Sequence, residues 1–136
     1  MSWGKIDLRE FKQFEKQLND LSKADMDALC REAAKGLAAR LLRKAKMRTP
    51  VDTGELRRNW NVDFDITQVG NEYEITVYNA TEYASYVEYG HRTRNHKGWV
   101  VGRFMMTKSA VELEKQAPVI LERMLMKKLG EIFNGE

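Results

Sequence analysis

The sequence is poor in cysteine and proline, with one Cys and two Pro among 136 residues. The single cysteine, Cys30, excludes an internal disulfide and a cysteine-based metal site, and such a residue is most often buried. No apolar run approaches the roughly 20 residues that a membrane-spanning helix requires. The first ten residues lack the regions of a signal peptide, so we expect synthesis in the cytoplasm.

The composition that is present is typical of a folded domain, with 43% hydrophobic and 32% charged residues. A chain of this length can bury one core, so we expect a single domain over residues 1–136. The net charge of +3 is too small to indicate a nucleic-acid partner by itself.

The charges are arranged in three blocks. Seven basic residues and one acid lie from Arg31 to Arg48, six acids and no Lys or Arg from Asn59 to Gly90, and five basic residues and no acid from His91 to Lys108. A solvated helix face is the simpler explanation of the first block, but opposite patches on one small domain favour self-association. The candidate residues for assembly or DNA contact are Arg40, Arg43, Lys44, Asp63, Asp65, Glu72, Glu74, Arg92, Arg94, Lys97 and Arg103.

The first third of the chain carries two helical patterns. Apolar residues at helical spacing from Leu8 to Leu21 predict a peripheral N-terminal helix within residues 1–22. A longer stripe from Met26 to Leu41 predicts a second helix that begins near Ser22 and ends before Thr49-Pro50.

Alternating residues predict a β-hairpin in the middle of the chain. The apolar positions Trp60, Val62, Phe64 and Ile66 define one half-buried strand, and a turn at Gly70-Asn71 leads into a second strand over residues 73–78. Residues 99–101 are expected to add a short third strand. The predicted fold class is therefore α+β, a small antiparallel sheet packed against long N- and C-terminal helices.

The segment after the hairpin combines a short helical pattern with a polar, basic stretch. We predict one or two helical turns within residues 81–89, ended by Gly90. Residues 90–98 contain no large apolar side chain, which predicts a mobile basic loop. The last helix is expected from Phe104 to about Phe133, and Pro118 should kink it or divide it in two.

The motifs that could carry chemistry are weak. Asp52-Thr53-Gly54 resembles the aspartic-protease triplet but follows a basic helix and a proline instead of a buried strand. His91 and His96 lack further metal ligands, and the spacing of Gly98 and Gly102 does not match a phosphate-binding loop. We therefore expect no enzyme activity, no cofactor and no metal.

A nucleic-acid-binding module is the alternative function. It would use the basic segment 91–103, with Trp99 as a stacking residue, and the basic helix 31–48. The aromatic residues near this segment, Tyr83, Tyr86, Tyr89 and Trp99, are more simply explained as core or interface anchors.

Three segments resemble, in order, the motifs of a family of bacteriophage tail-component proteins. They begin at Pro50, Asn79 and Gly102, and with the flanking helices the resemblance extends roughly from Lys23 to Ile132. The residues that carry it are Pro50, Val51, Thr53, Gly54, Leu56, Arg57, Asn79, Tyr83, Ala84, Val87, Glu88, Gly90, Gly102, Phe104 and Met105.

The resemblance implies a structural component of a phage or prophage neck or tail that acts in tail completion or head-to-tail joining. Proteins of this kind are thought to work as rings, here with six as a candidate subunit number. The implied partners are copies of the chain itself and other neck or tail proteins. Genomic DNA that passes through the ring is a further implied partner, contacted without sequence specificity. No membrane partner is implied. The implied location is the bacterial host cytoplasm during assembly and the virion tail or neck afterwards.

We interpret the motif residues as scaffolding. Gly54 and Gly90 are expected to adopt backbone conformations that other residues resist, and Asp52 or Thr53 to cap a turn. The side chains of Tyr83, Val87 and Phe104 are expected to fill the core. Glu88 is expected to pair with an arginine, either Arg92 or Arg94, or Arg57 or Arg58 of this or another copy.

Overall fold

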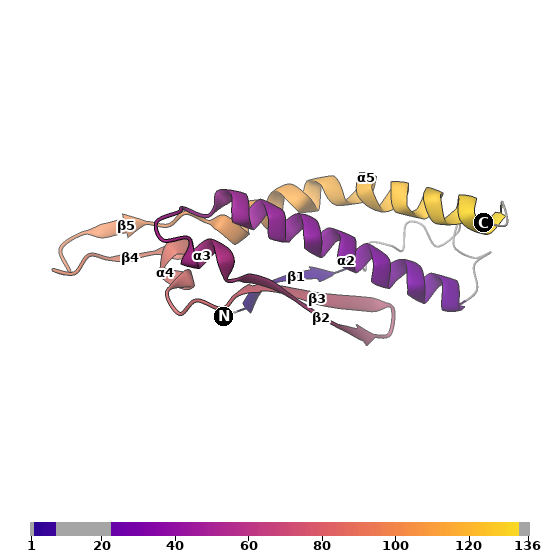
Figure 1. Ribbon diagram of the computed structural model, residues 1–136, viewed down its shortest axis with the longest axis horizontal. Coiled ribbons are helices and arrows are strands. Elements are labelled where there is room, and N and C mark those ends of the chain that lie inside the picture. Colours follow the sequence, from indigo (N-terminus) through magenta and orange to yellow (C-terminus); the bar gives the residue numbers. More distant parts are fainter. Residues whose placement is uncertain (1, 8–22, 134–136) are drawn as a thin grey trace.

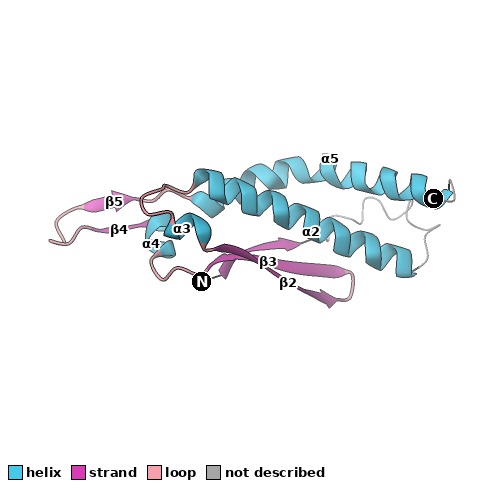
Figure 2. Cartoon of the chain, in the orientation of Figure 1, coloured by secondary structure: helices cyan, strands magenta, loops and turns pink. Residues whose placement is uncertain are grey.

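Two long helices, α2 (Lys23–Arg48) and α5 (Met105–Phe133), lie side by side, and α2 also packs on a β-sheet (Figure 1). The computed structural model describes residues 2–7 and 23–133. The sheet contains β1 (Ser2–Asp7), β2 (Trp60–Val69) and β3 (Glu72–Asn79). Two short helices, α3 (Glu55–Arg58) and α4 (Ala84–Tyr89), and a two-stranded ribbon of β4 (Gly90–Arg92) and β5 (Trp99–Val101) complete the described elements (Figure 2). The predicted α+β class is confirmed.

The sheet is antiparallel, in the order β1-β3-β2. The central strand β3 alternates as predicted, because Tyr73, Ile75 and Val77 are buried and the residues between them are half-buried. The third strand of this sheet is β1 and not residues 99–101, which pair with β4 in a separate ribbon. Residues 2–7 of the expected N-terminal helix are thus a strand, and the helical pattern from Leu8 to Leu21 lies outside the described residues.

The core is formed mainly where α2 meets the sheet and α5. The predicted stripe of α2 is confirmed, because Leu29, Ala33, Leu37 and Leu41 are almost fully buried. From α5, the buried leucines are Leu113, Leu121 and Leu125. Each fully buried leucine contributes roughly 1.5–3 kcal/mol of transfer free energy, so this contact is a principal source of stability. Cys30 is buried and unpaired, as expected.

Pro118 does not divide the last helix, and α5 continues through it. A helical proline removes the donor for the carbonyl four residues earlier, here that of Glu114. Both residues are exposed, so water can satisfy this carbonyl. The buried side chains of Leu113 and Leu121 hold the helix against the core on both sides of the proline. Of the two outcomes expected at Pro118, a kink or a division, the division does not occur. None of the helices in the described part of the chain is long and apolar enough to cross a membrane.

Strand β2 is interrupted by a bulge. Asp63 pairs with Thr76 but Thr67 pairs with Glu74, so four steps along β2 correspond to two along β3. The backbone N–H of Asp65 donates a hydrogen bond to Asp63 Oδ1 at 3.0 Å inside this irregular segment. Phe64, which alternation places on the buried face, is instead 64% exposed. A bulge turns side chains away from their regular alternation, and this explains why the prediction for Phe64 is wrong.

Two basic residues of α2 join it to α5 through one carboxylate. Lys44 and Arg48 both donate hydrogen bonds to Glu112, and Arg48 also contacts the hydroxyl of Ser109 at 3.1 Å. Lys44, which we selected as a candidate for assembly or DNA contact, is thus engaged within the chain. The hydrogen bonds from Lys44 and Arg48 lower the pKa of Glu112 from 4.5 to about 2.

This pKa shift predicts a pH-dependent stability. Because the folded-state pKa of Glu112 is lowered, its carboxylate stabilises the fold above about pH 4.5, and this contribution is lost as the pH falls toward about 2. We expect Glu112→Gln to lower the melting temperature at neutral pH and to have little effect on it near pH 2. Melting curves across this range test the prediction, with Glu114→Gln on the exposed side of α5 as control. The prediction would be contradicted if the melting temperature of Glu112→Gln lay below that of the wild type by the same amount at every pH.

Candidate interaction surfaces

The segment from Pro50 to Leu56 forms a turn and the start of α3. Gly54 has a φ of 84°, in the left-handed region that glycine tolerates, as expected. The Thr53 hydroxyl accepts a hydrogen bond from the backbone N–H of Glu55 at 3.3 Å, in line with the expected turn cap. Leu56 is buried, whereas Val51 is exposed. Leu56 therefore anchors the turn in the core, and the side chains of residues 51–53 and 55 face solvent.

Asn79 joins this turn to the segment that contains α4. Its side-chain Nδ2 donates to the carbonyl of Leu56 at 2.8 Å, and its Oδ1 accepts from the backbone N–H of Thr81 at 2.9 Å. Asn79 is fully buried, and an unpaired amide at this depth would be costly. The sequence gives no signal for this role beyond the position of Asn79 at the start of the second motif.

Tyr83, from the second motif, lies at the surface beside the first motif. A hollow of about 350 Å³ is lined by residues 50–56 together with Tyr83 and Val87. The Tyr83 hydroxyl approaches Glu55 Oε2 at 3.4 Å, and the residue is 40% exposed. The expectation that Tyr83 fills the core is wrong, because its ring borders a surface hollow. Val87 and Phe104 are half-buried, and Ala84 and Met105 are buried.

Glu88 is fully buried and binds the first turn of α5. Its two carboxylate oxygens accept hydrogen bonds from the backbone N–H of Met106 at 2.9 Å and of Thr107 at 2.8 Å, and from the Thr107 hydroxyl at 2.7 Å. The first N–H groups of a helix have no partner within it, and a negative charge there is favourable. Glu88 forms no ion pair with the described residues, so the pair expected with an arginine of the same chain is wrong.

The ribbon of β4 and β5 replaces part of the predicted mobile loop. Gly90 pairs with Val101, and Arg92 with Trp99, so only residues 93–98 connect the strands. Within this connection, the Thr93 hydroxyl accepts from the backbone N–H of Gly98 at 3.0 Å. Gly90 has a φ of 88° and ends α4, as predicted. The basic side chains Arg92, Arg94, Lys97 and Arg103 are exposed.

The ribbon extends past the ends of both long helices (Figure 1). It carries exposed aromatic and aliphatic side chains. Trp99 is 59% exposed, and a hollow of about 590 Å³ beside it is also lined by Tyr83, Tyr86 and Arg92. We use the name aromatic surface for the exposed residues Tyr83, Tyr86, Tyr89, Trp99, Val100 and Val101. Of these residues, Tyr83, Tyr86 and Trp99 line the same hollow with Arg92, and exposed aromatic side chains bordered by arginine are typical of a protein interface.

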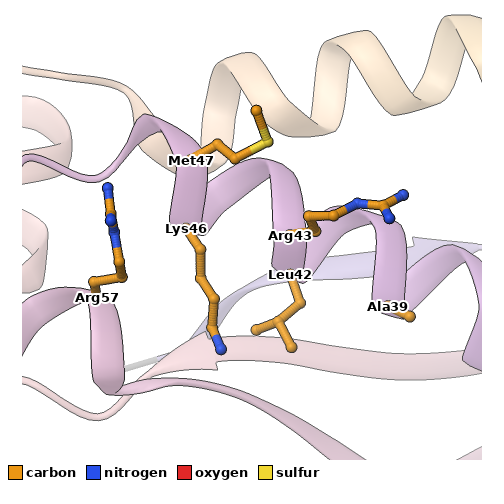
Figure 3. A pocket seen from close by; sticks show the side chains of 6 residues that line it. All are labelled: Ala39, Leu42, Arg43, Lys46, Met47 and Arg57. Atoms are coloured by element: carbon orange, nitrogen blue, oxygen red, sulfur yellow. The ribbon is translucent and has the colours of Figure 1, made fainter.

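A third hollow lies on α2, beside α3 (Figure 3). It measures about 520 Å³, and we use the name basic groove for the residues that line it, Ala39, Leu42, Arg43, Lys46, Met47 and Arg57. Arg57 comes from α3, and its Nη2 donates to the carbonyl of Thr49 at 3.3 Å. Of the other basic candidates on α2, Arg40 donates to the carbonyl of Gly36 and Lys44 binds Glu112.

The acidic candidates lie on the hairpin. Asp63 and Asp65 are exposed at the bulge of β2, whereas Glu72 and Glu74 are half-buried on β3. The structure therefore separates the predicted set into charges that are engaged within the chain and charges that face solvent.

Comparison with known proteins gives one match. A family model described as "Bacteriophage HK97-gp10, putative tail-component" matches residues 12–90, more than half of the chain. This match begins earlier than the resemblance inferred from the motifs and ends at Gly90, so it contains the first two motifs and not the third. No curated protein and no solved structure matches the chain.

Proposed function

Because the chain belongs to the HK97-gp10-like family of bacteriophage tail components, we propose that it completes the tail or joins it to the head by forming a ring with other copies of itself. The family is structural, which implies a role without catalysis. Within the particle, its partners would be other tail or neck proteins.

The aromatic surface is the observation that carries this proposal. The side chains of Tyr86, Tyr89 and Trp99 are more than half exposed, and Val101 on the same ribbon as Trp99 is even more exposed. Monomeric proteins rarely expose so many large apolar side chains on neighbouring elements, because leaving apolar surface in contact with water costs free energy. This surface therefore fits a role in which another protein covers it.

The position of the ribbon supports a ring. The ribbon extends away from the helices, so it can reach a neighbouring copy (Figure 1). We propose that it binds a different surface of that copy and not the neighbour's own ribbon. Such a contact is heterologous, and repeated heterologous contacts close into a ring when the rotation between subunits permits.

The exposed arginine and lysine residues of the ribbon suggest how DNA is accommodated. Arg94 and Lys97 lie at its tip and have no ion-pair partner among the described residues. Positive charges at the inner surface of a ring would attract the phosphate backbone without reading sequence.

We expect Trp99→Ala to weaken self-association of the full chain by roughly 30-fold or more, the typical loss for an aromatic residue at the centre of an interface. Sedimentation velocity and native mass spectrometry over a range of concentrations measure this loss, and negative-stain microscopy shows whether the wild-type oligomer is a ring. Val119→Ala is a matched control, because Val119 is exposed to a similar extent on α5.

A wild-type chain that stays monomeric at every concentration, with no change in Trp99→Ala, would contradict ring assembly. The exposed Trp99 and the basic tip of the ribbon favour one alternative, a module that binds nucleic acid. That alternative predicts a monomer whose DNA affinity falls steeply with salt and is reduced in the same variant.

A further inference from the structure

The bulge of β2 carries an exposed aromatic residue with an aspartate directly before and after it in the sequence. Phe64 is 64% exposed, and Asp63 and Asp65 on either side of it are exposed as well. Neither aspartate forms an ion pair with the described residues. We use the name acidic knob for Asp63, Phe64 and Asp65. The bulge therefore offers one exposed apolar side chain and two negative charges within three consecutive residues.

The basic groove has the opposite pattern. Ala39, Leu42 and Met47 provide its apolar part, and Arg43, Lys46 and Arg57 provide its positive charge (Figure 3). None of the three cations forms an ion pair with the described residues, and Met47 is 76% exposed. The hydrogen bond from Arg57 to the carbonyl of Thr49 holds one cation beside the groove. A complementary ligand would have an apolar centre and carboxylates around it.

We propose that the acidic knob of one copy docks in the basic groove of a second copy. Phe64 would cover Leu42 and Met47, and the two aspartates would approach Arg43, Lys46 and Arg57. The inference rests on the proposed ring function and names the residues of a contact within it. Knob and groove are different surfaces of one chain, so each copy can use both, and the contact is heterologous.

The form of the knob favours a side-chain contact over sheet extension. β2 is at the edge of its sheet, where a second strand could add by backbone hydrogen bonds. The bulge interrupts the regular row of backbone groups that such an addition requires. The phosphate backbone of DNA would match the three cations but leave the exposed side chain of Met47 uncovered, so a protein knob fits the groove better.

The test uses two variants of the full chain. The knob variant carries Phe64→Ala and Asp65→Lys, and the groove variant carries Arg43→Glu and Lys46→Glu. We expect each to lose self-association by at least about 100-fold, the effect of removing an interface anchor together with its charge pairs. An equal mixture should regain association as heterodimers, because the intact groove of the first variant can bind the intact knob of the second.

Control variants separate this contact from general changes in charge and hydrophobicity. Val69→Ala removes an exposed side chain from the same strand, and Lys35→Glu reverses an exposed charge on α2 outside the groove. Both should assemble like the wild type. Phe64→Ala alone is a further check, because an exposed side chain can be shortened without unfolding the chain, and it should still weaken association by roughly tenfold or more.

The outcomes distinguish the contact from the ring. Rings that persist in the knob variant and in Phe64→Ala would overturn the inference and leave the proposed function intact. If the wild type formed open dimers instead of rings, and both variants were monomeric, the result would support the contact and contradict the ring. A wild type and a mixture that stay monomeric would overturn both. A groove variant that assembles normally but loses DNA binding would overturn the inference and assign the groove to nucleic acid.

Discussion

Replacing Glu88 with alanine is expected to destabilise the fold by about 3 kcal/mol, the cost of leaving buried donors without a charged acceptor. For a chain of this length, this corresponds to a melting temperature lower by roughly 10 °C. The replacement removes all three hydrogen bonds that the carboxylate accepts at the start of α5. The backbone N–H of Met106 would then be buried without an acceptor, since it lies in a position that water does not reach.

Two further variants show whether the carboxylate itself is responsible. Glu88→Gln keeps an acceptor oxygen but loses the charge, so we expect an intermediate loss of stability. Glu82→Ala removes an exposed carboxylate from the preceding turn and should change stability by less than about 0.5 kcal/mol. Thermal unfolding followed by circular dichroism measures all three variants. If Glu88→Ala melts at the same temperature as Glu82→Ala, the capping role is wrong.

The long elements of the fold could be predicted because their signals are local. The spacing of Leu29, Ala33, Leu37 and Leu41 defines one face of α2 within a few turns, and burial confirms that face. The same holds for β3, whose alternation reflects a strand with a core on one side. The turn at Gly70 joins strands that are adjacent in the chain, so the pattern of a few residues is sufficient.

The features that could not be predicted depend on segments distant in the chain. β1 pairs with β3 about 70 residues later, and nothing within Ser2–Asp7 specifies that partner. Glu88 binds the backbone of residues 106 and 107, and backbone groups leave no mark in a sequence pattern. The exposure of Phe64 follows from the bulge, which breaks the period-two alternation on which the prediction rested.

The candidate surfaces were predictable as charge blocks but not as individual contacts. The basic block of α2 divides between Lys44, which binds Glu112, and Arg43, which lines the groove. Positions one apart on a helix point about 100° away from each other, so neighbouring charges meet different partners. Arg57 joins the groove only because the turn after Pro50 brings α3 beside α2, and charge counting along the chain does not detect this.

Gly102→Ala is expected to disrupt the root of the ribbon and, with it, self-association. A Cβ atom at this position would lie 2.4 Å from the carbonyl oxygen of Glu88 and 2.6 Å from the carbonyl carbon of Tyr89. Both are backbone atoms that cannot move aside independently. The segments would have to separate, which breaks the hydrogen bonds from Arg103 N to the Val87 carbonyl at 2.8 Å and from Phe104 N to the Glu88 carbonyl at 3.0 Å.

The expected cost of this substitution is about 3 kcal/mol, at the upper end of the usual range for overpacking. Because Glu88 belongs to one of the displaced segments, its bonds to α5 should weaken as well, and the ribbon should lose its fixed direction. Gly98→Ala is the matched control, since its Cβ would meet only side-chain atoms of Thr93, at 3.3 Å and beyond. The control should keep near-normal stability and assembly. Normal assembly of Gly102→Ala would show instead that the ribbon binds its partner without a rigid attachment to the body.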